Sequence, residues 1–196
     1  TIQLDRSDKK NALTTDMYKD LTQSIIQAEK NSNVSVIYIT GTDDSFCAGN
    51  DLQDFLSQPP TFKNSPAHKF LNTISQTKLP IVAAVNGSAV GIGVTMLLHC
   101  DFVYIQNDAQ LSLPFINLGL VPEAASSLLL PHLAGHQKAS ELLMLGEPFT
   151  PEFAKEIGLA NELCLPQDLH STAMKTATKL SSKPRTTNRG ALLTGI

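Results

Sequence analysis

The feature that most constrains the fold is a glycine-rich segment between two apolar runs. Ile81–Val85 (IVAAV) predicts a short buried strand, and Asn86–Gly93 after it contains three glycines. The residues that follow are apolar on nearly all sides, which is typical of a buried helix. We therefore predict a buried helix over Gly91–His99, whose N-terminus another group approaches too closely for a Cβ atom.

The N-terminus of this helix would direct free N–H groups and the positive end of a helix dipole at one spot. That arrangement suits a phosphate, a carboxylate or a developing oxyanion. A nucleotide phosphate is poorly supported, because Met96 stands where a dinucleotide fingerprint needs its third glycine and no Walker lysine follows. A Ser-His-Asp hydrolase is also poorly supported, because the sequence has no G-x-S-x-G motif. Cys47 is better explained as a small apolar side chain than as a nucleophile.

The composition is that of a globular chain and excludes some partners. Of the 196 residues, 42% are hydrophobic and 17% are charged. The net charge of −3 and the pI of about 5.9 disfavour nucleic acid as a partner. The three cysteines are widely spaced and lack metal-ligand spacing, so we expect reduced thiols, a reducing intracellular compartment and no metal site. No apolar run is long enough to span a bilayer.

Strand-like and helix-like patterns alternate along the chain and predict an α/β fold with parallel strands and right-handed crossovers. We expect strands at residues 2–4, 34–40, 81–85, 102–105, 110–113 and 161–165. We expect helices at residues 17–29, 67–77, 91–99, 126–133, 136–145, 151–157 and from 169 to about 183. From about Thr150 the pattern is mostly helical, which predicts a core over residues 1–149 and a C-terminal helical region over 150–196.

Five segments, in order, resemble the enoyl-CoA hydratase/isomerase (crotonase) superfamily. Phe46–Leu52 (FCAGNDL) and Asn86–Gly93 (NGSAVGIG) are similar to its two signature segments, and Pro114–Glu123 is similar to the third. Lys10–Leu13 and Ala154–Leu163 also fit. The resemblance implies a spiral core of repeated ββα turns, an acyl-CoA substrate with no further cofactor, and a homotrimer or dimer of trimers. This chain ends earlier than typical relatives, so we expect a final helical segment that helps trimerisation to be absent.

The resemblance also assigns roles to residues. In that family two backbone N–H groups hold the thioester oxygen, and by position they would belong to Ala48 and Ile92. The turn formed by Ala48, Gly49, Asn50, Asp51 and Leu52 would line the path of the CoA, while Gly91 and Phe115 would border the substrate. Two aimed N–H donors and a helix dipole would stabilise the enolate that forms when a proton leaves the carbon beside the thioester.

The acidic residues favour one branch of the family. Relatives that hydrate enoyl-CoA use two glutamates, and the matching positions here hold Thr95 and Phe115, so a hydratase is disfavoured. Glu123 remains, as in the Δ3,Δ2-enoyl-CoA isomerase branch, although Ala124 and Ala125 follow it where relatives often have glycine. We expect Glu123 to move one proton during the 3-enoyl to 2-enoyl shift of fatty-acid β-oxidation, with a pKa raised by apolar neighbours.

Two alternatives stay open at the level of the sequence. The chain could be a non-catalytic acyl-CoA-binding protein, or it could catalyse another reaction in the same pocket, such as dienoyl isomerisation or thioester hydrolysis. Glu123 could also be an ordinary acid at a helix N-terminus. An isomerase of this kind is expected in the cytoplasm of a bacterium, or in the peroxisome or mitochondrion of a eukaryote.

Overall fold

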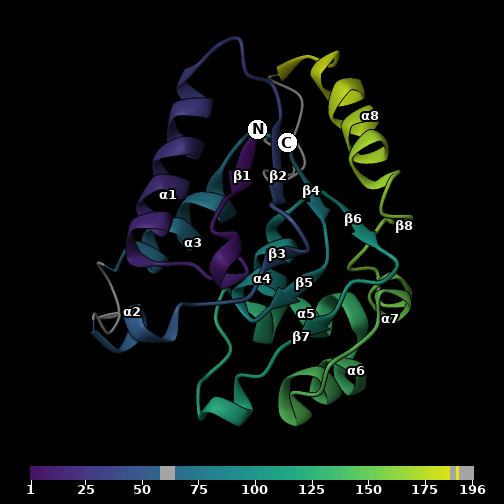
Figure 1. The fold of residues 1–196 in the computed structure, drawn as a ribbon. Coiled ribbons are helices and arrows are strands. Elements are labelled where there is room, and N and C mark those ends of the chain that lie inside the picture. The colour runs from purple at the N-terminus through teal and green to yellow at the C-terminus, as the bar shows by residue number, and fades with distance from the viewer. Residues whose placement is uncertain (58–64, 186–188, 190–196) are drawn as a thin grey trace.

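The computed structural model describes residues 1–57, 65–185 and 189, which form two parallel β-sheets surrounded by helices (Figure 1). The larger sheet has the strand order β1-β2-β4-β6-β8 and the smaller one β3-β5-β7. The strands are β1 (Ile2–Leu4), β2 (Ile37–Gly41), β3 (Ser45–Cys47), β4 (Ile81–Val85), β5 (Ser88–Val90), β6 (Phe102–Gln106), β7 (Leu111–Ser112) and β8 (Glu162–Cys164). All strand pairs are parallel, so the predicted α/β fold is confirmed.

Helices connect these strands. They are α1 (Thr15–Lys30), α2 (Leu52–Ser57), α3 (Pro66–Gln76), α4 (Ile92–Thr95), α5 (Ser126–Ala134), α6 (His136–Ser140), α7 (Pro151–Glu156) and α8 (Leu169–Ser181). Short 3₁₀ turns lie at Ser7–Lys9, Met96–His99 and Ile116–Leu118, and Glu141–Leu145 is π-helical. The buried helix predicted over Gly91–His99 is thus α4 followed by a 3₁₀ turn.

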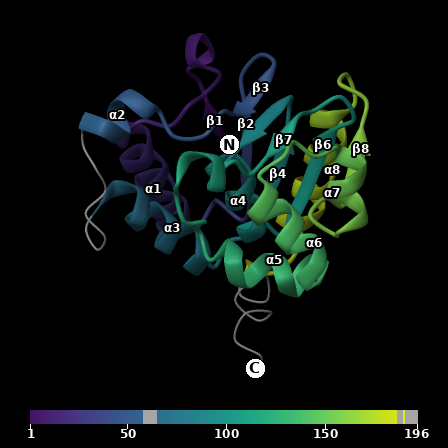
Figure 2. The same ribbon diagram turned by 90° about the horizontal axis from the view of Figure 1, so that it is seen from below.

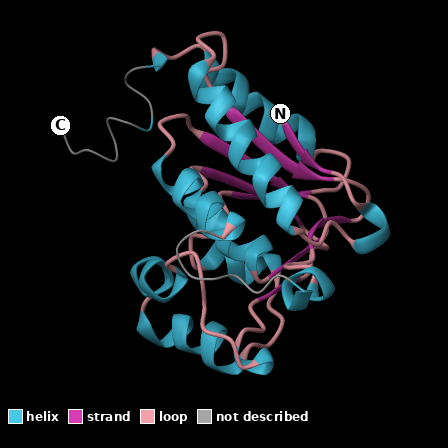
Figure 3. Cartoon of the chain, turned by 90° about the vertical axis from the view of Figure 1, so that its left-hand side faces the viewer, coloured by secondary structure: helices cyan, strands magenta, loops and turns pink. Residues whose placement is uncertain are grey.

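The chain passes from the larger sheet to the smaller one three times. β2 is followed by β3, β4 by β5 and β6 by β7, and helical segments then return the chain to the larger sheet. Each ββα turn therefore adds one strand to each sheet, and the repeated turns build a spiral (Figure 3). The consequence is that the connections after β3, β5 and β7, which hold the three distinctive sequence segments, lie at adjacent strand ends.

Both faces of the larger sheet are buried, which explains the uninterrupted apolar sequence of β4. Successive side chains of a strand point to opposite faces. Ile81, Ala83 and Val85 pack in the cluster that includes residues of α1 and α3, whereas Val82 and Ala84 pack against α8. Figures 1 and 2 show α1 and α3 on one side of this sheet and α8 on the other.

The region from residue 150 onward is joined to this sheet. β8 pairs with β6, and Leu169, Ala173 and Ala177 of α8 pack on the sheet face formed by β2, β4 and β6. The C-terminal residues therefore supply a strand as well as helices. The domain boundary near residue 150 stays a prediction, because residues 186–188 and 190–196 lie outside the described part of the chain.

Only one strand of the smaller sheet was predicted: β7 lies within the strand expected at residues 110–113. β3 and β5 are three residues each, too short to show an alternating pattern, and no strand was predicted at either place. The short helix α2 also lies in a stretch for which no helix was predicted. No helix within the described residues is both long and apolar enough to cross a membrane.

Glycine lets the two signature segments come into contact. A Cβ atom on Gly93, in α4, would overlap the carbonyl oxygen of Cys47 at the end of β3. Gly49 has a φ of 98°, and a Cβ there would lie 3.3 Å from the carbonyl oxygen of Val90. The close approach that was predicted at this helix N-terminus is therefore made by the backbone of the other signature segment.

Candidate active site

Glu123 lies in the turn that leads from the loop after β7 into α5. Its Oε1 accepts a hydrogen bond of 2.6 Å from the Thr95 hydroxyl. Thr95 has no exposed surface and belongs to α4, the helix whose first residue is Ile92. One acidic side chain is therefore held by a buried residue of α4.

The carboxyl group of Glu123 is tuned for proton transfer near neutral pH. Burial raises its pKa to about 7, and the hydrogen bond from Thr95 opposes part of that rise because it favours the charged form. A carboxyl group with this pKa can both accept and return a proton at neutral pH. The sequence predicted a raised pKa for Glu123, and the pKa is raised in the structure.

The charge of Glu123 contributes to the raised pKa values of two other buried groups, Tyr18 and Cys47, so Glu123 lies near both. Burial, with a smaller contribution from Glu123, raises the pKa of Tyr18 well above its usual value. Burial raises the pKa of the Cys47 thiol to about 12, and Glu123 adds to that shift. Both groups are therefore neutral at pH 7, so Cys47 is not an activated nucleophile. Glu123 lies within electrostatic reach of α1, β3 and α4 together.

The structure contradicts the assignment of the Ala48 amide as an oxyanion donor. The Ala48 N–H already donates to the carbonyl oxygen of Lys10, at 3.0 Å. This N–H group therefore points toward the Lys10–Leu13 segment. The Ala48 N–H group is therefore not free to hold a thioester oxygen.

The amide of Asn50, two residues later, is oriented differently. The carbonyl of Gly49 and the N–H of Asp51 both bond to Leu13, so Asn50 forms a parallel bridge with Leu13 and its own N–H points to the opposite side. β5 lies on that side, ending at Val90. The positive φ of Gly49 breaks the regular alternation of the strand, which explains why Ala48 and Asn50 differ.

The backbone N–H groups of Asn50 and Ile92 have no hydrogen-bond partner within the described residues. Across residues 1–57, 65–185 and 189, neither the Asn50 N–H nor the Ile92 N–H donates a hydrogen bond within the protein. Ile92 is the first residue of α4, where an amide has no partner inside the helix and the helix dipole is positive. Asn50 is further fixed because its Oδ1 accepts a 2.6 Å hydrogen bond from the Tyr18 hydroxyl.

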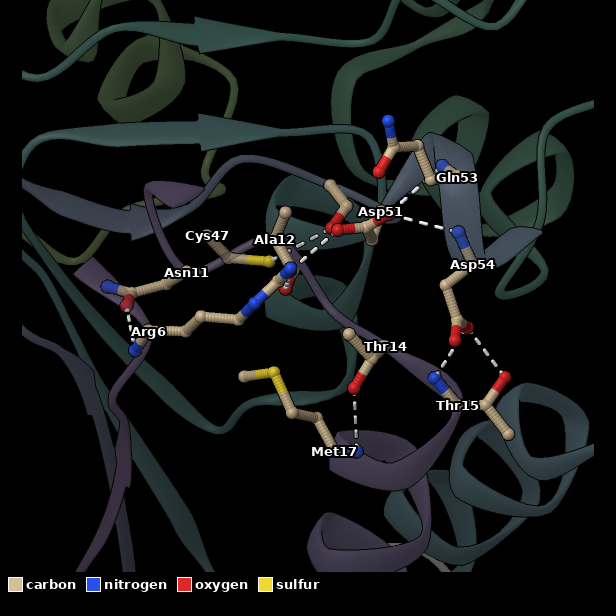
Figure 4. Close-up of polar contacts among 11 residues, drawn as sticks. Arg6, Asn11, Ala12, Thr14, Thr15, Met17, Cys47, Asp51, Gln53 and Asp54 are labelled. Carbon is tan, nitrogen blue, oxygen red and sulfur yellow. Dashed lines mark hydrogen bonds and ion pairs between the residues drawn. The ribbon is translucent and has the colours of Figure 1, made fainter. Parts of the chain in front are cut away.

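The rest of the predicted CoA-lining turn is held by polar contacts (Figure 4). Asp51 forms an ion pair of 2.7 Å with Arg6 and accepts bonds from the amides of Gln53 and Asp54 at the start of α2. Those amides and the Arg6 guanidinium hold the pKa of the Asp51 carboxyl below its usual value. The carboxylate of Asp51 thus fixes the turn to α2, while Leu52 beside it is 59% exposed.

Gly91 and Phe115, the two residues expected to border the substrate, lie close together. Phe115 is buried, and a Cβ on Gly91 would lie 3.9 Å from its Cζ atom. The aromatic ring therefore packs beside Gly91, the residue that precedes α4. In the described part of the chain, no three His, Cys, Asp or Glu side chains form a group that could hold a metal ion.

The structure thus combines a spiral of ββα turns with one buried carboxyl group, which Thr95 of α4 holds by a hydrogen bond. The family model for enoyl-CoA hydratase/isomerase matches residues 1–192. The chain belongs to the enoyl-CoA hydratase/isomerase family, the crotonase superfamily.

Similar proteins include members with different names. Enoyl-CoA delta isomerase 2 of Rattus norvegicus is 36% identical over 188 residues, and the mitochondrial enoyl-CoA hydratase of Pongo abelii is 32% identical over 187 residues. These alignments take in 93% and 94% of this chain, but 48% and 64% of the two relatives. The chain therefore spans about half the length of the rat protein.

Solved structures agree with this placement. OdaA of Pseudomonas aeruginosa is 44% identical with a TM-score of 0.94, covering 98% of this chain and 79% of that one. An enoyl-CoA hydratase/isomerase from Pseudoalteromonas atlantica T6c is 35% identical with a TM-score of 0.93, covering 98% of this chain and 78% of that one.

Proposed function

We propose that this protein is a Δ3,Δ2-enoyl-CoA isomerase that uses Glu123 as its acid/base. The observation that carries the proposal is the bond from Thr95 to Glu123, which replaces a second acid with a hydroxyl donor and leaves one tuned carboxyl group in the site. One carboxyl group is sufficient for a double-bond shift. Hydration by two glutamates is disfavoured, since Thr95 and Phe115 occupy the positions where hydratases of this family carry them.

In the proposed reaction the Glu123 carboxylate removes a proton from the carbon between the thioester carbonyl and the double bond. The electron pair of the broken C–H bond moves toward the carbonyl and gives a dienolate. The protonated Glu123 then returns the proton to the γ carbon, and the double bond closes between the α and β carbons. No atom is gained or lost, and the carboxylate is regenerated.

The negative oxygen of the dienolate needs donors that are already in place. We assign this role to the amides of Ile92 and Asn50, replacing the earlier assignment of Ala48. Support comes from the two N–H groups, which lack partners inside the described protein, and from the short distance between their segments at Gly49 and Val90. Such a donor contributes about 3 kcal/mol in other enzymes. Asn50, Gly49 and Leu52 would also lie along the CoA.

The decisive experiment compares the conversion of 3-hexenoyl-CoA to 2-hexenoyl-CoA by the wild type and by Glu123→Gln. Loss of a general acid/base lowers kcat by roughly 100-fold or more. Glu152→Gln, an exposed glutamate in α7, is the matched control and should retain the wild-type rate. Equal rates for the wild type and Glu123→Gln would refute the assignment. Tight CoA binding without turnover of any enoyl thioester would instead support the acyl-CoA-binding alternative.

We also propose that the chain assembles as a homotrimer. Large apolar side chains remain exposed on one chain, including Leu128 and Leu133 of α5 and Met144 and Leu145 after α6. Such a surface is usual for an interface between subunits. Light scattering should give a molar mass about three times the 21.1 kDa of one chain, and a monomeric mass at micromolar concentration would contradict the proposal. An acyl-CoA substrate also fits the reducing compartment that we expect, which is a bacterial cytoplasm, a peroxisome or a mitochondrion.

A further inference from the structure

The turn that carries Glu123 is strained. The two residues that follow it, Ala124 and Ala125, both have left-handed backbones, with φ values of 55° and 54°. A residue with a Cβ atom disfavours this region by a factor of roughly 5 to 30 in population. Two such residues in succession persist only where the surroundings hold them. Glycine, which would adopt this conformation readily, is absent from both positions.

The C-terminal side of the turn is held by Ser126. Its amide and its hydroxyl both donate to the carbonyl oxygen of Glu123, at 2.9 and 2.6 Å. These two bonds fix where the turn enters α5. They do not engage the peptide group of Ala124, whose carbonyl oxygen lies inside the protein.

His99 holds that carbonyl. Its Nε2 lies 2.9 Å from the carbonyl oxygen of Ala124. Because a carbonyl oxygen can only accept, Nε2 must carry the proton in this contact. The backbone of His99 is itself fixed, since the Arg189 guanidinium donates to its carbonyl oxygen at 2.6 Å. His99 follows Thr95 by one turn of the same helical segment, so both contacts to the Glu123 turn come from one rigid element.

We propose that His99 is a positioning residue for the Glu123 base: through the Ala124 carbonyl it holds the left-handed turn that presents the carboxyl group to Thr95. Burial lowers the pKa of His99, which keeps the ring neutral at pH 7 with one nitrogen free to donate. The inference rests on the proposed role of Glu123 in catalysis, but the contact with Ala124 can be tested without it.

The kinetic test uses His99→Leu, His99→Gln and the double variant His99→Leu with Ala124→Gly. Loss of the donor should lower kcat for 3-hexenoyl-CoA about tenfold, while KM changes less than about twofold because His99 does not touch the CoA turn. His99→Gln keeps an N–H at a similar place and should retain most of the activity. Adding Ala124→Gly to His99→Leu should recover kcat to within about threefold of the wild type, since glycine adopts the left-handed turn without support. His132→Leu, on the exposed side of α5, is the matched control.

The rescue separates positioning from general damage. A residue that only stabilises the fold would not have its loss of kcat repaired by one glycine in the Glu123 turn. A wild-type kcat for His99→Leu, or an equal loss with and without Ala124→Gly, would overturn the proposal.

A stability measurement covers the case in which the enzyme has another activity. The decrease in urea midpoint caused by His99→Leu should be smaller in the Ala124→Gly background than in the wild type, because the two positions act on one turn. Equal decreases in the two backgrounds would overturn the proposal whatever the substrate. Failure of Glu123→Gln to affect turnover would refute the proposed function alone.

Discussion

Under the proposed function, Thr95 is the side chain that distinguishes this site from that of a hydratase. It lies without exposed surface in α4 and donates to Glu123 from a position where hydratases of this family would have a glutamate. A second carboxylate there would repel the charge of Glu123, whereas a hydroxyl stabilises it. The hydroxyl therefore limits how far burial can raise the pKa of the base.

Removing that hydroxyl should move the pH profile of the enzyme. In the proposed reaction Glu123 acts as the base in its charged form, so kcat/KM for 3-hexenoyl-CoA should rise with pH through about 7 and then level off. Thr95→Val removes the bond that favours the charged form and should shift this rise about one pH unit upward. Thr95→Ser, which keeps the hydroxyl, should leave the profile in place. A profile unchanged by Thr95→Val would show that the bond does not act on the base.

At the scale of secondary-structure elements, the site depends on the contact between the end of β3 and α4. The sequence was sufficient to predict the helix near Gly91 and the strand before it. It assigned the Ala48 amide to the oxyanion, which the structure contradicts, because the φ of Gly49 sets the direction of the amides in this turn and no pattern of side chains records that φ. Thr95 was missed for a related reason. A threonine in an apolar helix is recognised as a donor only when its acceptor, 28 residues away, is placed beside it.

The N-terminus of α4 offers a test of a backbone group. Ile92 is the first helical residue, where proline is tolerated because its φ suits the position and its missing N–H has no partner in the helix. Ile92→Pro should therefore keep the fold while removing one proposed oxyanion donor, and kcat should fall by about 100- to 1000-fold. Ile92→Val keeps the amide and corrects for the change of side chain. Similar kcat values for the two variants would exclude the Ile92 amide as a donor.

For the whole molecule, the spiral explains why distant segments meet. The larger sheet could be predicted, because buried parallel strands such as β4 have continuous apolar sequences. Of the smaller sheet only β7 was predicted, because β3 and β5 contain three residues each, too few to show an alternating pattern. The site lies where these short strands end. Burying the Glu123 carboxylate there costs free energy, and the packing of the entire fold must offset that cost.

The free-energy cost of burying the Glu123 carboxylate should appear in the pH dependence of global stability. The folded pKa of Glu123 is about 7 against 4.5 for the exposed group, so the folded state binds the proton more tightly. The contribution is fully favourable below pH 4.5 and is lost as the pH rises through 7. Relative to Glu123→Gln, the wild type should lose about 2–3 kcal/mol of unfolding free energy between pH 4.5 and 8.

The comparison with Glu123→Gln is essential because His99 titrates in the same window with the opposite sign. Its lowered pKa means that stability falls as the pH drops and the ring becomes charged. This contribution is common to both proteins and cancels in the difference. The sequence has no tryptophan, so urea unfolding is best followed by far-UV circular dichroism at several pH values. Parallel stability curves for the two proteins would mean that Glu123 keeps an ordinary pKa in the folded state, and a base tuned by burial would then be excluded.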